Sequence, residues 1–225
     1  DKNFSKHQTD FDFIEHDYDQ IAFTFHATAS KLQRNHAYQT FFNNQIFAIM
    51  PIDHSKNTFT VVWSIPKDFA TEEYVRDNID LLGQQLNTDI AISGEILEFE
   101  LSSSRAKEYC IPGKCLIADS AHSFHPLAGQ GLNLGIADID VLVDEFKKAK
   151  SKGRSLGDIK VLKKYEVRRK ILNEAMLNGV NFLNYLFHSE NIYTKLFRNR
   201  GLRLVNKIPI IKNLLIKNAV GKIKI

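Results

Sequence analysis

The spacing of apolar residues changes several times along the chain, and each change marks a different structural element. Four segments place large apolar residues at every second position: 18–29, 46–52, 58–65 and 96–101. This period predicts strands with one buried face. Residues 53–57 are polar and turn-forming, so the second and third segments are expected to form a hairpin. Residues 11–103 are therefore predicted to form a mostly antiparallel sheet.

Helical spacing appears first within residues 71–86, which should cover this sheet. Thr71 can cap the helix, and Glu72 and Glu73 follow in the first turn, where the helix dipole favours acidic side chains. Asp158 can cap a later, long helix, which is expected to run to about Phe187.

A further helix is expected to start near Leu132. Its apolar residues recur at helical spacing, and we expect that face to be buried: Leu132, Ile136, Ile139, Val143 and Phe146. The outer face is expected to carry the polar residues Asp138, Asp144, Glu145, Lys147 and Lys148.

This order of elements predicts an α/β fold with α+β character. The antiparallel sheet occupies residues 1–103, a strand, loop and helix follow in residues 104–150, and helices fill residues 151–225. The hydrophobic content of 44% and charged content of 25% are ordinary for a globular protein. The net charge of +4 is too small to indicate a nucleic-acid partner.

No run of about 18 apolar residues predicts a membrane span, and the first residues lack the apolar core of a signal peptide. We therefore expect a cytoplasmic location. Residues 191–225 contain no Asp or Glu and interleave Lys and Arg with apolar residues. This segment is interpreted either as a solvated helical face or as a contact with an anionic membrane surface or an acidic partner, which would place the protein peripherally at the inner membrane face.

The cysteines and histidines do not indicate a metal site. Cys110 and Cys115 have no second pair to complete a ligand set, so two reduced thiols are expected, with a disulfide around the intervening turn as the alternative. His122 and His125 are expected to pack in a loop, because a metal site would need further ligands and the pattern H-E-x-x-H is missing.

Residues 116–140 carry most of the chemical information. A short buried strand over 115–118 is expected to end at Asp119, a loop with Gly129 and Gly131 follows, and the helix then begins. This order presents backbone amides and the positive end of a helix dipole to a ligand. Asp119 is placed to accept hydrogen bonds from sugar or ribityl hydroxyls. The glycines do not match the dinucleotide pattern G-x-G-x-x-G, so their spacing alone leaves the ligand open.

The stretch as a whole resembles the second FAD-binding motif of the flavin-dependent aromatic hydroxylases. The residues that carry the resemblance are Asp119-Ser120-Ala121-His122, the run from His125 to Gly135, and Asp138. Within this family, the stretch is most similar to the ubiquinone-biosynthesis hydroxylase branch. Other segments of the chain also resemble that branch: 17–20, 48–52, 62–64, 165–169 and 197–221.

The resemblance implies an FAD-dependent monooxygenase that uses NAD(P)H. It would hydroxylate an aromatic ring, a prenylated phenol of ubiquinone biosynthesis, through a flavin C4a-hydroperoxide. Residues 1–103 would bind the substrate and residues 104–150 the flavin half of FAD. Asp119 would bind the ribityl chain. The isoalloxazine ring would be lined by Pro126, Gly129, Gln130, Gly131, Leu132 and Asn133. No catalytic side chain is identified, because the cofactor carries the oxidation chemistry.

Three departures from the family pattern affect these expectations. Ala118 replaces a glycine, which we expect to be tolerated, and Lys2 replaces the glycine of a motif D-G-x-x-S at residues 1–5. The βαβ unit that holds the ADP half of FAD is absent from the 225 residues. We therefore expect a fragment that by itself binds FAD weakly or not at all and is inactive, and that pairs with an ADP-binding part on another chain. The alternative is an inactive split remnant, or a non-catalytic protein that contacts a membrane or a biosynthetic complex.

Overall fold

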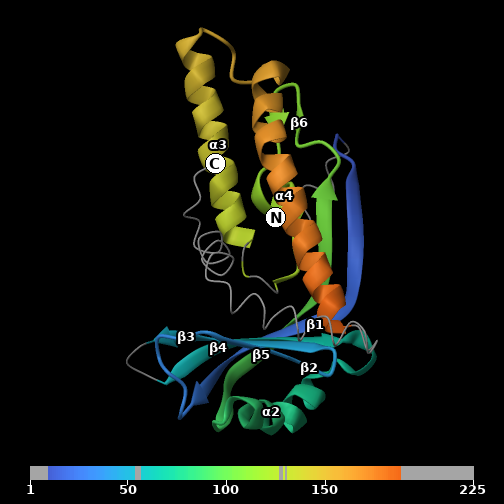
Figure 1. Cartoon of the computed structure of the whole chain (residues 1–225), viewed down its shortest axis with the longest axis vertical. Coiled ribbons are helices and arrows are strands. Elements are labelled where there is room, and N and C mark those ends of the chain that lie inside the picture. The colour runs from blue at the N-terminus through green and yellow to red at the C-terminus, as the bar shows by residue number, and fades with distance from the viewer. Residues whose placement is uncertain (1–9, 54–56, 127–128, 130, 189–225) are drawn as a thin grey trace, which may run out of the picture. The chain divides into compact units, whose positions relative to one another are not determined.

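The computed structural model describes residues 10–53, 57–126, 129 and 131–188 (Figure 1). Within these residues six strands form one sheet, in the order β2-β3-β4-β1-β5-β8. The chain divides into two compact units, one of residues 17–101 and one of residues 1–16 with 102–225. The predicted fold class, an antiparallel sheet followed by helices, is confirmed.

The sheet of the first unit is built from long antiparallel strands. Their bounds are β1 (Phe13–Ala29), β2 (Tyr38–Phe42), β3 (Gln45–Asp53), β4 (Thr58–Pro66) and β5 (Ile90–Ala106). β3 and β4 form the predicted hairpin, and both Phe23 on β1 and Phe47 on β3 lie opposite Trp63 on β4. The alternating pattern therefore predicted the strands correctly, although β1 and β5 extend beyond the predicted segments.

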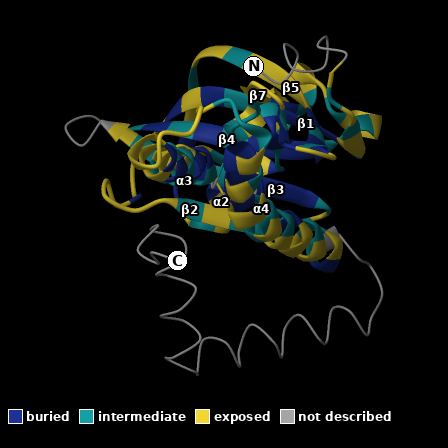
Figure 2. Cartoon of the chain, turned by 90° about the horizontal axis from the view of Figure 1, so that it is seen from above, coloured by how far each residue is buried: buried dark blue, intermediate teal, exposed yellow. Residues whose placement is uncertain are grey.

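One face of this sheet forms the core of the unit. Large buried side chains recur at every second position along β1, β3 and β4, and Figure 2 shows much of these strands in the dark blue of buried residues. Those of β4 are Phe59, Val61, Trp63 and Ile65, the face that the sequence pattern predicts. The indole Nε1 of Trp63 donates to Oε1 of Gln45 at 2.7 Å, so the one polar atom of this ring is paired.

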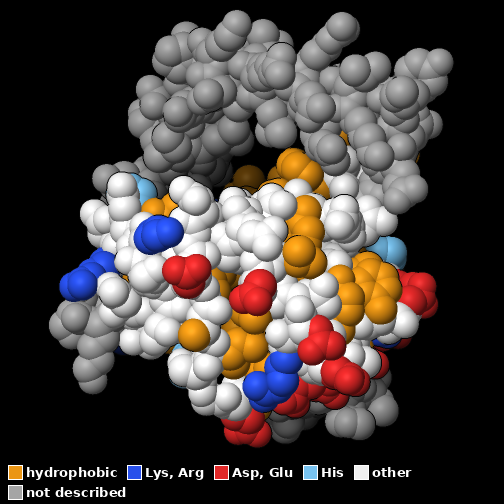
Figure 3. Space-filling view, turned by 90° about the horizontal axis from the view of Figure 1, so that it is seen from below, with side chains coloured by type: hydrophobic (Ala, Val, Ile, Leu, Met, Phe, Trp, Pro, Cys, Tyr) orange, Lys and Arg blue, Asp and Glu red, His pale blue; other side chains and the backbone are white. Residues whose placement is uncertain are grey.

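The helix α2 (Glu72–Leu86) packs against this core and follows the short turn η1 (Lys67–Phe69). The hydroxyl of Thr71 accepts the Tyr74 N–H at 3.0 Å, which confirms the predicted cap. Val75 and Leu82 are fully buried. The opposite side of α2 exposes Glu72, Glu73, Asp77 and Asp80. Acidic side chains gather on the face shown in Figure 3, so α2 is amphipathic, as its spacing predicts.

The second unit departs from prediction before the glycine loop. β6 (Cys110–Ile111) and β7 (Lys114–Cys115) form a small hairpin, and β8 (His122–Ser123) pairs with β5. The predicted strand over residues 115–118 is wrong, because β7 ends at Cys115. The next backbone groups bond elsewhere: Leu116 N–H donates to the Tyr109 carbonyl, and the Leu116 carbonyl accepts the Tyr165 hydroxyl. No neighbouring strand is needed to satisfy them.

Two helices complete the described part of the second unit. They are α3 (Gly131–Ser151) and α4 (Ile159–His188), which pack against each other and lie where the sequence predicts helices (Figure 1). Oδ1 of Asp158 accepts the Lys160 N–H at 2.9 Å, which confirms the predicted cap. No helix in the described residues is long and apolar enough to cross a membrane. The basic segment 191–225 lies outside the described residues.

The predicted orientation of α3 is wrong. Leu132 is 77% exposed, and the other aliphatic residues of the predicted buried stripe are also exposed: Ile136, Ile139 and Val143. Asp138 and Glu145, which the pattern assigns to solvent, are buried. The reason is that α4 supplies arginines to both carboxylates, Arg169 to Asp138 and Arg168 to Glu145. A buried carboxylate is tolerated only when it is paired in this way.

Candidate functional site

The candidate site lies where the turn after β7 meets the amino end of α3. This turn, η2 (Ala118–Ser120), carries Asp119, whose side chain is exposed. Oδ1 of Asp119 lies 3.8 Å from the position that a Cβ atom would take on Gly131, the first residue of α3. The first turn of a helix has unpaired N–H groups and a partial positive charge. The carboxylate therefore stands beside backbone donors that are able to bind a polar, electron-rich ligand.

The backbone is open at Gly129, the one described residue between Pro126 and α3. The Gly129 N–H donates to the Pro126 carbonyl at 3.0 Å, and Gly129 has a φ of 57°. This left-handed conformation favours glycine. No atom lies within 4 Å of the position that a Cβ would take there. A flat ligand could therefore approach the backbone at this point.

The structure places the described candidate residues around one helix end. Those exposed to solvent are Asp119, Pro126, Gly129, Leu132 and Asn133, and Gly131 is partly exposed. Gln130 lies outside the described residues. These residues therefore share a surface on which a ligand could be bound.

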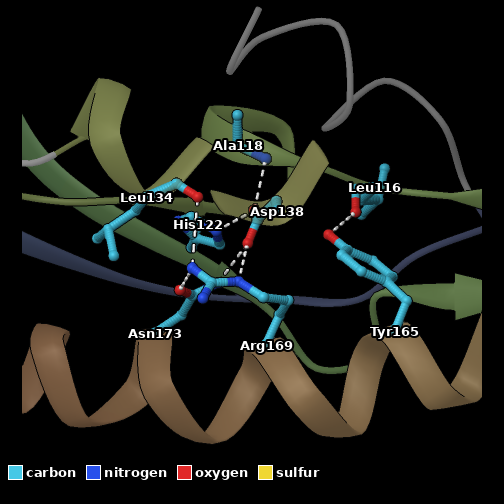
Figure 4. Close-up of polar contacts among 8 residues, drawn as sticks. All are labelled: Leu116, Ala118, His122, Leu134, Asp138, Tyr165, Arg169 and Asn173. Carbon is cyan, nitrogen blue, oxygen red and sulfur yellow. Dashed lines mark hydrogen bonds and ion pairs between the residues drawn. The ribbon is translucent and has the colours of Figure 1, made fainter. Parts of the chain in front are cut away.

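A buried polar cluster lies beneath this surface (Figure 4). Asp138 is 0% exposed, and donors converge on both of its oxygens. Its Oδ2 accepts the Ala118 N–H at 2.9 Å and lies 2.7 Å from Nε2 of His122. Its Oδ1 accepts Nε of Arg169 at 2.7 Å and Nδ2 of Asn173 at 3.2 Å. A single carboxylate thus joins the Asp119-bearing turn, β8 and α4.

The charge state of Asp138 follows from these contacts. Burial by itself favours the protonated acid, but the hydrogen bonds from His122, Arg169 and the Ala118 N–H outweigh burial. The net effect is to lower the pKa of Asp138 below its ordinary value. Asp138 is therefore ionised at neutral pH and balances the buried guanidinium of Arg169.

One side of α4 holds the segments on both sides of the candidate loop. Tyr165, Arg169 and Asn173 are spaced four residues apart and face the same way. The Tyr165 hydroxyl donates to the Leu116 carbonyl at 2.9 Å, and NH2 of Arg169 lies 3.4 Å from the Leu134 carbonyl. The sequence analysis gave these side chains no role. Their spacing was the available signal, because buried polar residues repeating every four positions indicate a packed helix face.

The two histidines are structural in this arrangement, but His122 lies in the strand β8 and not in a loop, because it pairs with Arg105 of β5. His122 is buried, bonded to Asp138, and its ring centroid lies 5.8 Å from that of Tyr109. His125 is buried as well. Within the described residues, no group of three or more His, Cys, Asp or Glu side chains is arranged to hold a metal ion.

The sequence of this chain is similar to that of known proteins. Residues 3–179 match the family model described as "FAD binding domain". The chain is 37% identical over 123 residues to 3-demethoxyubiquinol 3-hydroxylase of Escherichia coli, which is 55% of this chain and 32% of that protein. It is 26% identical over 211 residues to ubiquinone hydroxylase UbiM of Neisseria meningitidis, which is 92% of this chain and 46% of that protein. The chain thus spans less than half of each relative.

A solved structure gives the corresponding likeness in fold. The p-nitrophenol 4-monooxygenase PnpA of Pseudomonas putida superimposes with a TM-score of 0.74 over 96% of this chain and 57% of that one. The sequence identity is 15%, so this likeness shows the fold.

Proposed function

The chain belongs to the family described as "FAD binding domain", and on that premise we propose that it forms part of an FAD-dependent monooxygenase that hydroxylates an aromatic ring. The membership confirms the resemblance seen in residues 116–140. The substrate we propose is a prenylated phenol of ubiquinone biosynthesis. Support comes from the relatives, which include a 3-demethoxyubiquinol 3-hydroxylase and a ubiquinone hydroxylase.

The observation that carries the proposal is the position of Asp119 beside the amino end of α3. The residues present fit a flavin with a ribityl chain. A carboxylate accepts hydrogen bonds from hydroxyl groups, and Asp119 is exposed, so a ligand is able to reach it. The open backbone at Gly129 suits the flat edge of a ring system. The roles of Pro126, Gln130, Leu132 and Asn133 along the ring stay part of this proposal.

The positive end of α3 accounts for how the chain would assist the reaction. When bound, FAD supplies the redox chemistry, with NAD(P)H as the source of electrons and dioxygen as the source of the inserted oxygen atom. The first-turn N–H groups of α3 would stabilise negative charge on the ring edge they face. Asp138 and Arg169 would act indirectly, because they hold the Ala118 N–H and the Leu134 carbonyl on either side of the site.

The partner and location belong to the same proposal. The ADP half of FAD would be held by an ADP-binding part on another chain that carries a glycine-rich βαβ unit. A cytoplasmic location with peripheral contact at the inner membrane face is supported by the cationic, apolar pattern of residues 191–225.

A flavin titration tests the cofactor site. The full chain, mixed with an ADP-binding part that carries a G-x-G-x-x-G unit, is titrated with FAD, and binding is followed by quenching of flavin fluorescence. Asp119→Ala should weaken binding about tenfold, the effect of losing roughly 1.4 kcal/mol of hydrogen bonding. Asp140→Ala is the matched control, because Asp140 is an exposed acid on α3 outside the candidate site. Absence of quenching by the unaltered chain and the ADP-binding part together would contradict the proposed flavin site.

A turnover assay tests the reaction. The chain and its ADP-binding partner part are supplied with FAD, NADPH and a prenylated phenol, and the product is identified by mass spectrometry. The expected product is heavier by one oxygen atom, and that atom derives from labelled dioxygen. Oxidation of NADPH without an oxygenated product would sink the hydroxylase assignment.

A further inference from the structure

Positive charge concentrates where the end of α3 lies beside the start of α4. Seven Lys and Arg side chains line two adjoining hollows at this place, and the larger hollow has a volume of about 500 Å³. The two hollows share Lys148, Lys164 and Glu145 in their walls. Glu145 is the one acidic side chain that lines either hollow among the described residues. We call this region the α3–α4 hollow.

Three of the seven cations have carboxylate partners. Lys148 Nζ lies 2.7 Å from Oδ2 of Asp144 and 3.2 Å from Oε1 of Glu145. NH1 of Arg168 lies 2.6 Å from each of the same two oxygens. Lys163 pairs with two other carboxylates. These contacts hold the walls of the hollow in place, and the nearby acidic groups are already paired in them.

The other four cations lack a carboxylate partner within the described part of the chain. They are Lys152, Arg154, Lys160 and Lys164, and all four are exposed. The three paired cations meet four carboxylates between them, so the seven cations keep a net charge of about +3, which is an electrostatic cost. The amino end of α4 at Ile159 adds a partial positive charge to the same place. The hollow therefore presents a field that an anion with several charges would neutralise.

We propose that the α3–α4 hollow binds phosphate groups. Lysine ammonium groups are compact point charges that suit phosphate oxygens, and the single arginine adds a planar, forked donor. One carboxylate would leave most of this net charge unbalanced, whereas a diphosphate or two adjacent phosphates would balance it. The phosphate groups belong either to a small phosphorylated molecule or to the headgroups of an anionic phospholipid surface. This site is separate from the candidate flavin site and does not depend on it.

Two double variants of equal charge test the proposal in the full chain. Lys152→Gln with Lys164→Gln removes two cations from the hollow. Lys147→Gln with Lys150→Gln removes two exposed cations of α3 that line neither hollow. Circular dichroism and urea unfolding establish that both variants are folded. Both also retain residues 191–225, so that segment contributes equally to each.

Each protein is studied with two probes, sodium pyrophosphate by calorimetric titration, and vesicles of phosphatidylcholine with phosphatidylglycerol by co-sedimentation. The hollow variant should bind at least one probe about tenfold more weakly than the α3 control, with the difference shrinking at high salt. Loss confined to pyrophosphate identifies a small phosphorylated ligand, and loss confined to vesicles identifies lipid headgroups. Equal binding by the two variants in both arms would overturn the proposal.

Discussion

The methyl group of Ala118 lies directly against Gly135 of α3. A Cβ atom built on Gly135 would come within 2.7 Å of the Cβ of Ala118. The backbone of Ala118 has a φ of 51°, a left-handed conformation that is uncommon for alanine. The turn that carries Asp119 and the first turns of α3 are therefore in direct contact, and one of the two positions must lack a side chain.

Gly135→Ala should destabilise the protein by about 1–3 kcal/mol, because the added methyl overpacks this contact. Ala118→Gly added to Gly135→Ala should recover most of the loss, since it removes the opposing methyl and the left-handed alanine. Urea unfolding measures both effects. Gly179→Ala is the control, because no atom lies within 4 Å of its Cβ position. That change should stabilise α4 by about 0.5–1 kcal/mol. A double variant no more stable than Gly135→Ala would contradict the assigned contact.

Asp138→Ala should cost about 3–5 kcal/mol of unfolding free energy, because it leaves the buried guanidinium of Arg169 without its carboxylate. Asp140→Ala, an exposed change on the same helix, should stay within about 0.5 kcal/mol of the unaltered chain. The Asp138 variant should also weaken FAD binding, since the Ala118 N–H loses its acceptor. Equal stability of the two variants in urea would show that the buried cluster does not hold the turn.

The stability of the protein should fall in acid through Asp138. The contacts lower its pKa in the folded state below the ordinary value of 3.8. A group with a depressed pKa contributes stability above its unfolded pKa and loses that contribution as the pH falls through the folded value. The stability difference between the unaltered chain and Asp138→Asn should therefore shrink as the pH falls below about 4. Urea unfolding at a series of pH values checks this, and a difference that grows in acid would reverse the sign of the argument.

Cys110 should resist alkylation in the folded protein. Burial is the main cause that raises the pKa of its thiol to about 12, and the Sγ donates to the Leu162 carbonyl. Cys115 is partly exposed, and burial raises its pKa as well. Iodoacetamide at pH 8 should label Cys115 slowly and Cys110 more slowly still, while both react fully in urea. Peptide mass spectrometry gives the two rates. A Cys110–Cys115 disulfide in the purified protein would disagree with the free thiols of the structure.

Much of the fold was predictable, because it depends on local periodicity. Alternation predicted β3, β4 and the buried side of β4, where Phe59 and Trp63 point into the core. Helical spacing and the caps at Thr71 and Asp158 predicted the starts of α2 and α4. The short apolar run after Cys115 predicts a strand that the structure does not have. Such a run does not reveal that Tyr165 and Tyr109 satisfy the backbone hydrogen bonds of this segment.

The stretch from Leu116 to Asp140 shows what each level decided. The sequence by itself determined the order of turn, glycine loop and helix, and the residues that share each face of α3. Only the tertiary structure decided that the face with Asp138 and Glu145 would be buried. The physical reason is that a carboxylate can leave water only when donors meet it, and these donors, Arg169 and Arg168, come from α4, 31 and 23 positions further along the chain. Periodicity describes one helix, whereas burial depends on its partner.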